Sequence, residues 1–157
     1  MLVGGFIWQD YILAEQDASF VSIATIAPLT GYDGRWWRMV EDRNRENGGK
    51  PVNYIPRTPS LSVTLQLSRT VLCNLTKFRA EDAEGAVRII DKVGVIPARS
   101  WWLAGFFSRP QRGDKIETAL ETFFVDDVDV VEKEAPDGVV RDLKYRLMLT
   151  GASHRRV

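Results

Sequence analysis

The chain has 157 residues, of which 45% are hydrophobic and 27% charged, and this composition predicts one globular domain over residues 1–157 with its own core. The 21 basic and 21 acidic side chains cancel, so no net charge draws the whole chain to nucleic acid or to an acidic membrane. The single cysteine, Cys73, excludes an intrachain disulfide framework and a thiolate metal cluster within one chain.

The beginning of the chain predicts neither a membrane span nor a secretory signal. Met1–Trp8 is apolar, but Asp10 interrupts the run before it could cross a bilayer, and no basic residue precedes it. We therefore expect folding in a cytoplasm. Ser19–Ala27 has strong β propensity and predicts a strand that ends at Pro28.

A long loop is predicted next, at about residues 29–57, because glycines and prolines punctuate this stretch. A short strand over Trp36–Glu41 could divide it. Loops of this length inside a domain are usually functional or poorly ordered. Its aromatic and basic side chains are the main candidates for a site: Trp36, Trp37, Arg38, Arg43, Arg45 and Tyr54.

This aromatic and basic group fits two kinds of partner. Aromatic rings stack on bases and arginines meet phosphates, which is how single-stranded nucleic acid is bound. The same residue types are enriched at protein–protein interfaces. Glu41, Asp42 and Glu46 are interleaved with the arginines and the whole chain is neutral, so the pattern favours a protein interface over nucleic acid.

The middle of the chain predicts a strand followed by helices. Ser60–Ser68 alternates between apolar and polar residues, as a half-buried strand does. Val71, Leu72, Leu75 and Phe78 recur at helical spacing, and Glu81–Val93 carries an apolar stripe with Gly94 at the position that ends a helix. Ser100–Phe107 is rich in aromatic residues and predicts a buried strand before a loop over Ser108–Asp114.

The last long stretch, Lys115–Gly151, predicts two long strands joined by a tight turn at Pro136, Asp137 and Gly138. Alternation places Val139, Leu143, Tyr145, Leu147 and Leu149 on one face. A short basic tail follows at residues 152–157. The sum is an α+β fold, a mostly antiparallel β-sandwich or barrel with one or two flanking helices.

No catalytic centre emerges from the residue pattern. Asp127 and Asp129 share a strand face while Asp126 points away, and two carboxylates could bind a hard cation, although a solvated acidic strip explains them better. His154 is the only histidine and lies in the basic tail, and Cys73 suits a small core residue. We expect no metal, no cofactor and no enzymatic activity, with a metal-dependent hydrolase at these aspartates as the weakest alternative.

The order of elements resembles the tube proteins of bacteriophage tails and type VI secretion systems. The resemblance rests on Val40–Gly49, on Tyr54–Leu67, and on Phe123–Val131 leading into Leu143–Leu149. It covers about two-thirds of the chain and consists of periodicity and order. The extra segment Arg69–Ala80 before the helix departs from the family pattern and leaves a baseplate or tube-capping variant open.

The resemblance implies a tail-tube-like structural virion protein, located in the tail and assembled in the host cytoplasm. Its subunits would form hexameric rings that stack into a conduit for DNA ejection, with sheath, baseplate or terminator proteins as further partners. The loop Gly31–Arg57 would contact neighbouring subunits, and Glu121, Asp127 and Asp129 would form an acidic strip in the lumen that repels DNA. The alternatives are a baseplate or tail-terminator adaptor and a nucleic-acid-binding domain.

Overall fold

Six antiparallel strands close into a barrel within residues 21–57, 68–77 and 91–152, which are the residues that the computed structural model describes. The strand order around the barrel is β1-β2-β3-β6-β5-β4. The strands are β1 (Lys50–Ile55), β2 (Arg69–Lys77), β3 (Lys92–Pro97), β4 (Lys115–Glu117), β5 (Thr122–Glu134) and β6 (Val140–Gly151). The expected antiparallel α+β architecture is therefore present, in its barrel form.

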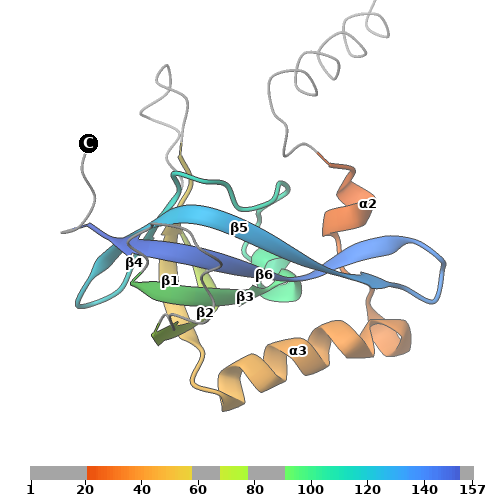
Figure 1. Ribbon diagram of the computed structural model, residues 1–157. Helices are drawn as coiled ribbons and strands as arrows, with labels where there is room; N and C mark the ends of the chain where they lie inside the picture. The colour runs from red at the N-terminus through yellow and green to blue at the C-terminus, as the bar shows by residue number, and fades with distance from the viewer. Residues whose placement is uncertain (1–20, 58–67, 78–90, 153–157) are drawn as a thin grey trace, which may run out of the picture.

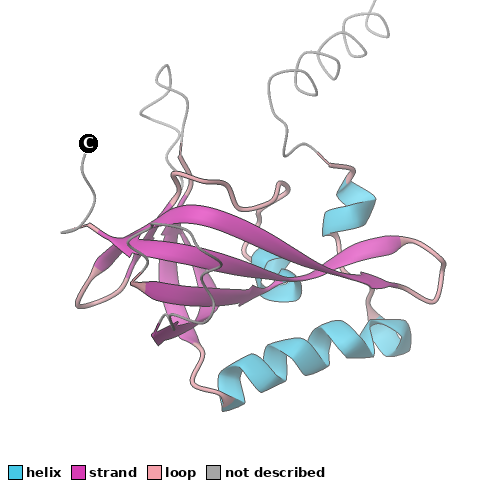
Figure 2. Cartoon of the chain, viewed as in Figure 1, coloured by secondary structure: helices cyan, strands magenta, loops and turns pink. Residues whose placement is uncertain are grey.

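The helices lie outside the strands (Figure 2). They are α2 (Ile23–Ile26), the 3₁₀ turn η1 (Gly31–Gly34), α3 (Arg35–Glu46) and α4 (Ala98–Leu103). Helix α3 runs along the barrel beside β2 and β3 (Figure 1). Helix α4 follows directly from the end of β3 and closes that end of the barrel, because Trp101 is buried and its ring packs 4.7 Å from that of Tyr54 and 4.0 Å from that of Phe106.

The β5–β6 hairpin confirms the two long strands and the tight turn predicted for the last stretch of the chain. The prediction differs in that Lys115–Glu117 forms a separate strand, β4, and Val139 lies outside β6 with 37% of its surface exposed. The pairing of the hairpin runs from Phe123 opposite Gly151 to Glu134 opposite Val140, and Gly138 closes the turn with φ of 82°. The inward side chains of Tyr145, Leu147 and Leu149 are fully buried. Regular alternation favours a long ribbon of this kind because every second side chain enters the core.

The distal half of the hairpin extends beyond the other strands (Figure 1). Strand β3 pairs with β6 only between Lys144 and Leu149, and β4 pairs with β5 only at residues 122–124. Past that point α2 supports the ribbon, because Arg141 Nη1 donates to the carbonyl oxygens of Ala24 at 2.6 Å and Ala27 at 3.1 Å. The guanidinium of Arg141 thus satisfies the last carbonyl groups around a very short helix.

Several sequence predictions are wrong within the described residues. The predicted loop at 29–57, with its optional strand Trp36–Glu41, contains η1, the twelve-residue helix α3 and strand β1. The expected helical spacing from Val71 onward belongs to β2, and Gly94 lies inside β3 instead of ending a helix. Ser100–Leu103 belongs to α4, and Ile23–Ile26 is helical instead of extended.

Other predictions fall outside the described residues. These are the strand over residues 60–67, the helix over 81–90, and the tail from Ser153 onward with His154. The helix prediction ends in β3, whose first residues are Lys92 and Val93. Of the segments that carry the tube-family resemblance, Val40–Glu46 is helical instead of a loop, and most of Tyr54–Leu67 lies outside the described residues.

Candidate interaction surface

The predicted interface residues divide into buried and exposed groups. Trp37 and Tyr54 have no exposed surface and belong to the core, so their predicted role as partner contacts is wrong. The indole Nε1 of Trp37 donates to the carbonyl oxygen of Asp142 at 2.9 Å, which ties α3 to β6. Because these two rings are buried, they cannot stack on the bases of a single-stranded nucleic acid in this structure.

The remaining members of that group lie on the exposed side of α3. Trp36 is 39% exposed, and the ammonium group of Lys133 from the hairpin lies 4.6 Å from the centre of its ring. Arg38 donates to the carbonyl oxygen of Gly31 at 2.9 Å. Arg43 is exposed, and Arg45 forms an ion pair with Glu41 at 2.9 Å. These side chains can meet a partner only along the outer surface of α3.

The predicted acidic strip is interrupted by a β-bulge. Glu121 is exposed and precedes β5, which begins at Thr122, whereas Phe123 and Val125 at the start of that strand are buried. Between Val125 and Asp127 the register shifts by one residue, after which Asp127 and Asp129 face outward. Such a bulge inserts one extra residue and reverses the side-chain alternation beyond it. Glu121 therefore does not belong to the strip that Asp127 and Asp129 form on β5.

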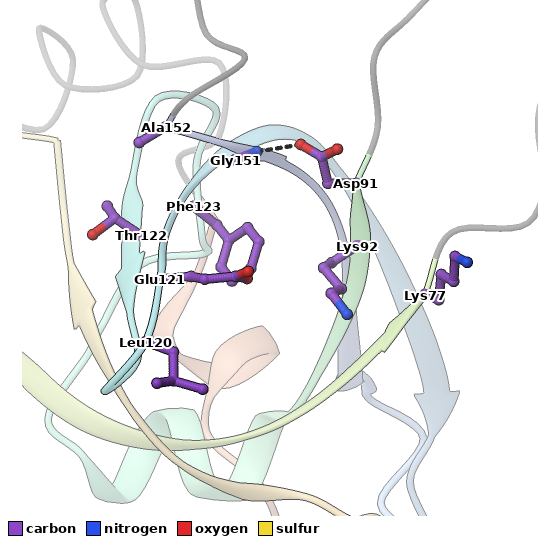
Figure 3. Close-up of a pocket in the computed structure, with 9 residues that line it drawn as sticks. All are labelled: Lys77, Asp91, Lys92, Leu120, Glu121, Thr122, Phe123, Gly151 and Ala152. Atoms are coloured by element: carbon purple, nitrogen blue, oxygen red, sulfur yellow. Dashed lines mark hydrogen bonds between the residues drawn. The ribbon is translucent and has the colours of Figure 1, made fainter.

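Glu121 instead lies at the end of the barrel opposite α4, which we call the barrel mouth. A pocket of about 470 Å³ opens there, lined by Lys77, Asp91, Lys92, Leu120, Glu121, Thr122, Phe123, Gly151 and Ala152. Figure 3 shows Glu121 and Lys92 pointing into this mouth with the Phe123 ring between the strands. Leu120 is 93% exposed. The Asp91 carboxylate accepts a 2.6 Å hydrogen bond from the Gly151 amide. Charges of both signs line the mouth.

A buried polar group is centred on Asp114, which ends the loop predicted over Ser108–Asp114. Its carboxylate accepts hydrogen bonds from the Tyr54 hydroxyl, from the Arg57 amide at 2.6 Å and from the Gln111 amide at 2.8 Å. Burial raises the pKa of Asp114, and the hydrogen bonds oppose that rise. Burial and the neighbouring Asp114 carboxylate raise the pKa of Tyr54 well above its ordinary value. These three hydrogen bonds join β1 and the segment after it to the loop before β4, so the role of the carboxylate is structural.

An apolar and basic surface surrounds α4. Leu103 and Phe107 are 64% and 61% exposed, and the Phe107 ring lies 5.1 Å from that of Trp102. Arg38 and Arg99 line a shallow pocket of about 170 Å³ together with Trp102 and Leu103. We call these five residues the α4 face. Sequence reasoning missed it because the aromatic run was assigned to a buried strand.

The other candidate groups are structural or absent from the described part of the chain. Cys73 is buried, as predicted for a small core residue, and burial raises the pKa of its thiol to about 12. Within residues 21–57, 68–77 and 91–152, no group of three or more histidine, cysteine, aspartate or glutamate side chains could hold a metal ion. The same residues contain no helix long and apolar enough to cross a membrane.

Comparison with protein-family models, with curated proteins and with solved structures returned no match.

Proposed function

We propose that this protein is a non-enzymatic structural subunit that assembles with copies of itself into rings, which stack into a tube of the bacteriophage-tail type. The main support for this proposal is the exposed α4 face. Leu103 and Phe107 each expose more than three-fifths of their surface beside a barrel whose interior is filled by its own side chains. Exposed apolar groups of this size, bordered by charges, are typical of surfaces that another protein covers.

The long hairpin at the end of the described chain supports the same function. The hairpin carries one part of the tube-family resemblance, and its distal half leaves the barrel. A projecting ribbon can reach a neighbouring subunit without disturbing the core. The resemblance to the family adds three features to this proposal. The rings would be hexameric, the tube would conduct DNA, and the subunits would contact sheath, baseplate or terminator proteins.

One observation favours a second candidate, a baseplate or tail-terminator adaptor. The barrel closes through β1–β4 pairing within one chain, so no neighbour is needed to complete the sheet. In addition, β5 is bordered past Phe124 by the loop before β4, because the Gly113 amide donates to the Val125 carbonyl and the Val125 amide to the Asp114 carbonyl, both at 2.8 Å. A self-sufficient barrel suits a protein that works as a discrete monomer or small oligomer.

Negative-stain electron microscopy over a concentration series, with sedimentation of the same samples, separates the two candidates. Rings or hollow tubes with a central pore are expected for the tube subunit. A monodisperse monomer at the highest concentration would overturn intrinsic ring assembly and leave the adaptor function. Added single-stranded DNA in a second series tests the nucleic-acid alternative, for which affinity must fall steeply with salt.

A further inference from the structure

One row of side chains along α3 and its C-terminal cap contains no acidic residue. Trp36, Val40, Arg43 and Asn47 are four, three and four residues apart, which is the spacing that places side chains on one side of a helix. The ammonium group of Lys133 lies 4.6 Å from the centre of the Trp36 ring, so the row begins beside the β5–β6 hairpin. The acidic residues of the helix lie outside the row: Glu41, Asp42 and Glu46.

A groove of about 330 Å³ separates this row from the outer surface of the barrel, and we call it the α3 groove. Its lining residues come from α3 and its cap and from three neighbouring strands, β2, β3 and β6. They are Met39, Val40, Arg43, Asn44, Asn47, Asn74, Val95 and Lys144. The strand residues point outward, because Cys73, Ile96 and Tyr145, which are next to them in the sequence, are buried in the core. The volume lies in the range of small-molecule sites, which begins at about 300 Å³.

Two cationic side chains line the groove from opposite sides. Arg43 comes from α3 and is exposed, and Lys144 comes from β6 and is half-buried. The residues paired with Lys144 are Pro97 on β3 and Val131 on β5, so strand pairing places no carboxylate opposite it. Within the part of the chain that the structure describes, neither cation forms an ion pair, and no carboxylate is among the lining residues.

The outward carboxylates of β5 lie away from the α3 groove. Asp127 is opposite Met148, and Asp129 is opposite Arg146. Side chains directly opposite each other are closer than diagonal ones, so Arg146 and not Lys144 is the nearest cation to Asp129 across this pair of strands. The strand order also puts β5 on the far side of β6, whereas the groove extends over β3 and β2. The groove is therefore locally positive, although the whole chain is neutral.

Asparagine amides form the polar part of the groove beside the two cations. Asn44 is buried, and its amide donates to the Val95 carbonyl at 2.9 Å, which holds α3 against β3. Asn47 is exposed and Asn74 is half-buried, and each of these amides can both donate and accept hydrogen bonds. Apolar side chains of α3 and β3 complete the lining. A ligand for this groove must combine negative charge with hydrogen-bonding groups.

We propose that the α3 groove binds one nucleoside phosphate unit, with the phosphate between Arg43 and Lys144 and the base or sugar on Asn47 and Asn74. An arginine fork and a lysine point charge are both suited to phosphate, and asparagine amides suit the edges of bases. The unit is either a free nucleotide or one residue of a single strand, which share this chemistry. The site goes beyond the proposed assembly, because the α4 face adjoins the opposite side of α3.

Isothermal titration calorimetry of the full chain with adenosine monophosphate and with adenosine tests both halves of the site. Arg43→Gln and Lys144→Gln should each weaken binding of the monophosphate by about tenfold or more, because each removes a charge-assisted hydrogen bond, and should leave adenosine binding unchanged. Asn74→Ala should weaken both probes by a similar factor. Arg112→Gln is the matched control, since it removes one arginine charge at an exposed position in the loop before β4. Circular dichroism and thermal melting verify that each variant folds, and Arg43→Gln alters an exposed side chain, so it keeps the test valid if Lys144→Gln impairs folding.

A short single-stranded oligoadenylate identifies the source of the unit. Affinity at least about tenfold above that of the monophosphate, lost in Arg43→Gln and falling with salt, assigns the site to a strand. Equal or weaker affinity assigns it to the free nucleotide. The proposal would be overturned if neither probe bound at about 1 mM, if adenosine bound as tightly as its monophosphate, or if Arg112→Gln caused an equal loss. Ring assembly is measured separately by sedimentation and depends on none of these outcomes.

Discussion

Arg109 and Asp142 form a two-point ion pair in which Nε donates to Oδ2 at 2.9 Å and Nη2 donates to Oδ1 at 2.7 Å. The Tyr145 hydroxyl adds a third hydrogen bond to the same carboxylate at 2.8 Å. Asp142 has no exposed surface and lies on β6 just before β3 pairing begins at Lys144. The pair therefore fastens the loop after α4 to the root of the projecting hairpin.

Replacing Arg109 with alanine should destabilise the protein by about 3–5 kcal/mol, because the buried Asp142 carboxylate loses its charged partner. Urea denaturation of the variant gives the free energy of unfolding directly. Arg112→Ala is the matched control, since that arginine lies in the same loop and is exposed, and it should change stability by about 0.5 kcal/mol or less. Equal effects of the two substitutions would contradict the structural role of the Arg109–Asp142 pair.

Trp36 and Trp37 are adjacent residues with opposite roles, so they provide a matched pair. Trp37→Ala should cost about 3–5 kcal/mol of stability, because it removes a fully buried indole and its hydrogen bond to the Asp142 carbonyl. Trp36→Ala should cost about 1 kcal/mol or less, mainly through the lost contact with Lys133. Thermal or chemical denaturation measures both. A larger effect at Trp36 than at Trp37 would be inconsistent with the packing of α3.

The two buried tyrosines predict a loss of stability at alkaline pH. Burial raises the pKa of Tyr54 and of Tyr145, with a further rise from Asp114 and Asp142 respectively, while both phenols ionise near pH 10 in an unfolded chain. Above that pH the unfolded state holds fewer protons than the native state, so stability should fall by about 1.4 kcal/mol per pH unit for each tyrosine. Denaturation at a series of pH values above neutrality checks the slope.

Ultraviolet titration of phenolate tests the burial of Tyr54 and Tyr145. Tyr54→Phe should remove absorbance from the late titration phase that accompanies unfolding. If every phenol titrated in one early step with the fold intact, the burial of Tyr54 and Tyr145 would be refuted.

The β-bulge in β5 predicts a tolerated deletion. Asp126 is the extra residue between Val125 opposite Leu149 and Asp127 opposite Met148. Its removal leaves both pairings in place and should change stability by about 1 kcal/mol or less, on the scale of a surface change. Deleting Val128 instead should shift every following side chain to the opposite face and prevent folding. Circular dichroism and urea denaturation compare the two, and a tolerated Val128 deletion would contradict this register.

The hairpin was predictable from sequence because its core residues alternate over a long stretch, as Tyr145, Leu147 and Leu149 show. Helix α3 was missed because its buried face consists of Trp37, Glu41 and Asn44. These residues have helical spacing, but two of the three are polar, so hydrophobic periodicity gives no signal. Their burial depends on tertiary partners: the Asn44 amide donates to the Val95 carbonyl at 2.9 Å, and Glu41 pairs with Arg99.

The remaining errors have equally specific causes. Residues 71–73 of β2 are all buried, and beside them the Leu72 amide donates to the Ser100 hydroxyl of α4 at 3.0 Å, where β3 does not reach. Covering both faces removes the alternation that identifies a strand. The α4 face was invisible in the sequence because Trp101 fills the barrel end while Leu103 and Phe107 point outward from the same aromatic run. The acidic strip was misassigned at Glu121 because parity cannot reveal a bulge.

The closure of the barrel through β1 and β4 carries a kinetic consequence. The residues joined there, such as Asn53 and Glu117, are 64 residues apart in the sequence, whereas β5 and β6 are joined by a single turn. Local ribbons form in about 1–10 μs, but distant pairings must first overcome the entropy of closing a long loop. The hairpin should therefore form early during folding and the β1–β4 seam last, which makes the seam the rate-limiting step and the first contact to open under mechanical or thermal load.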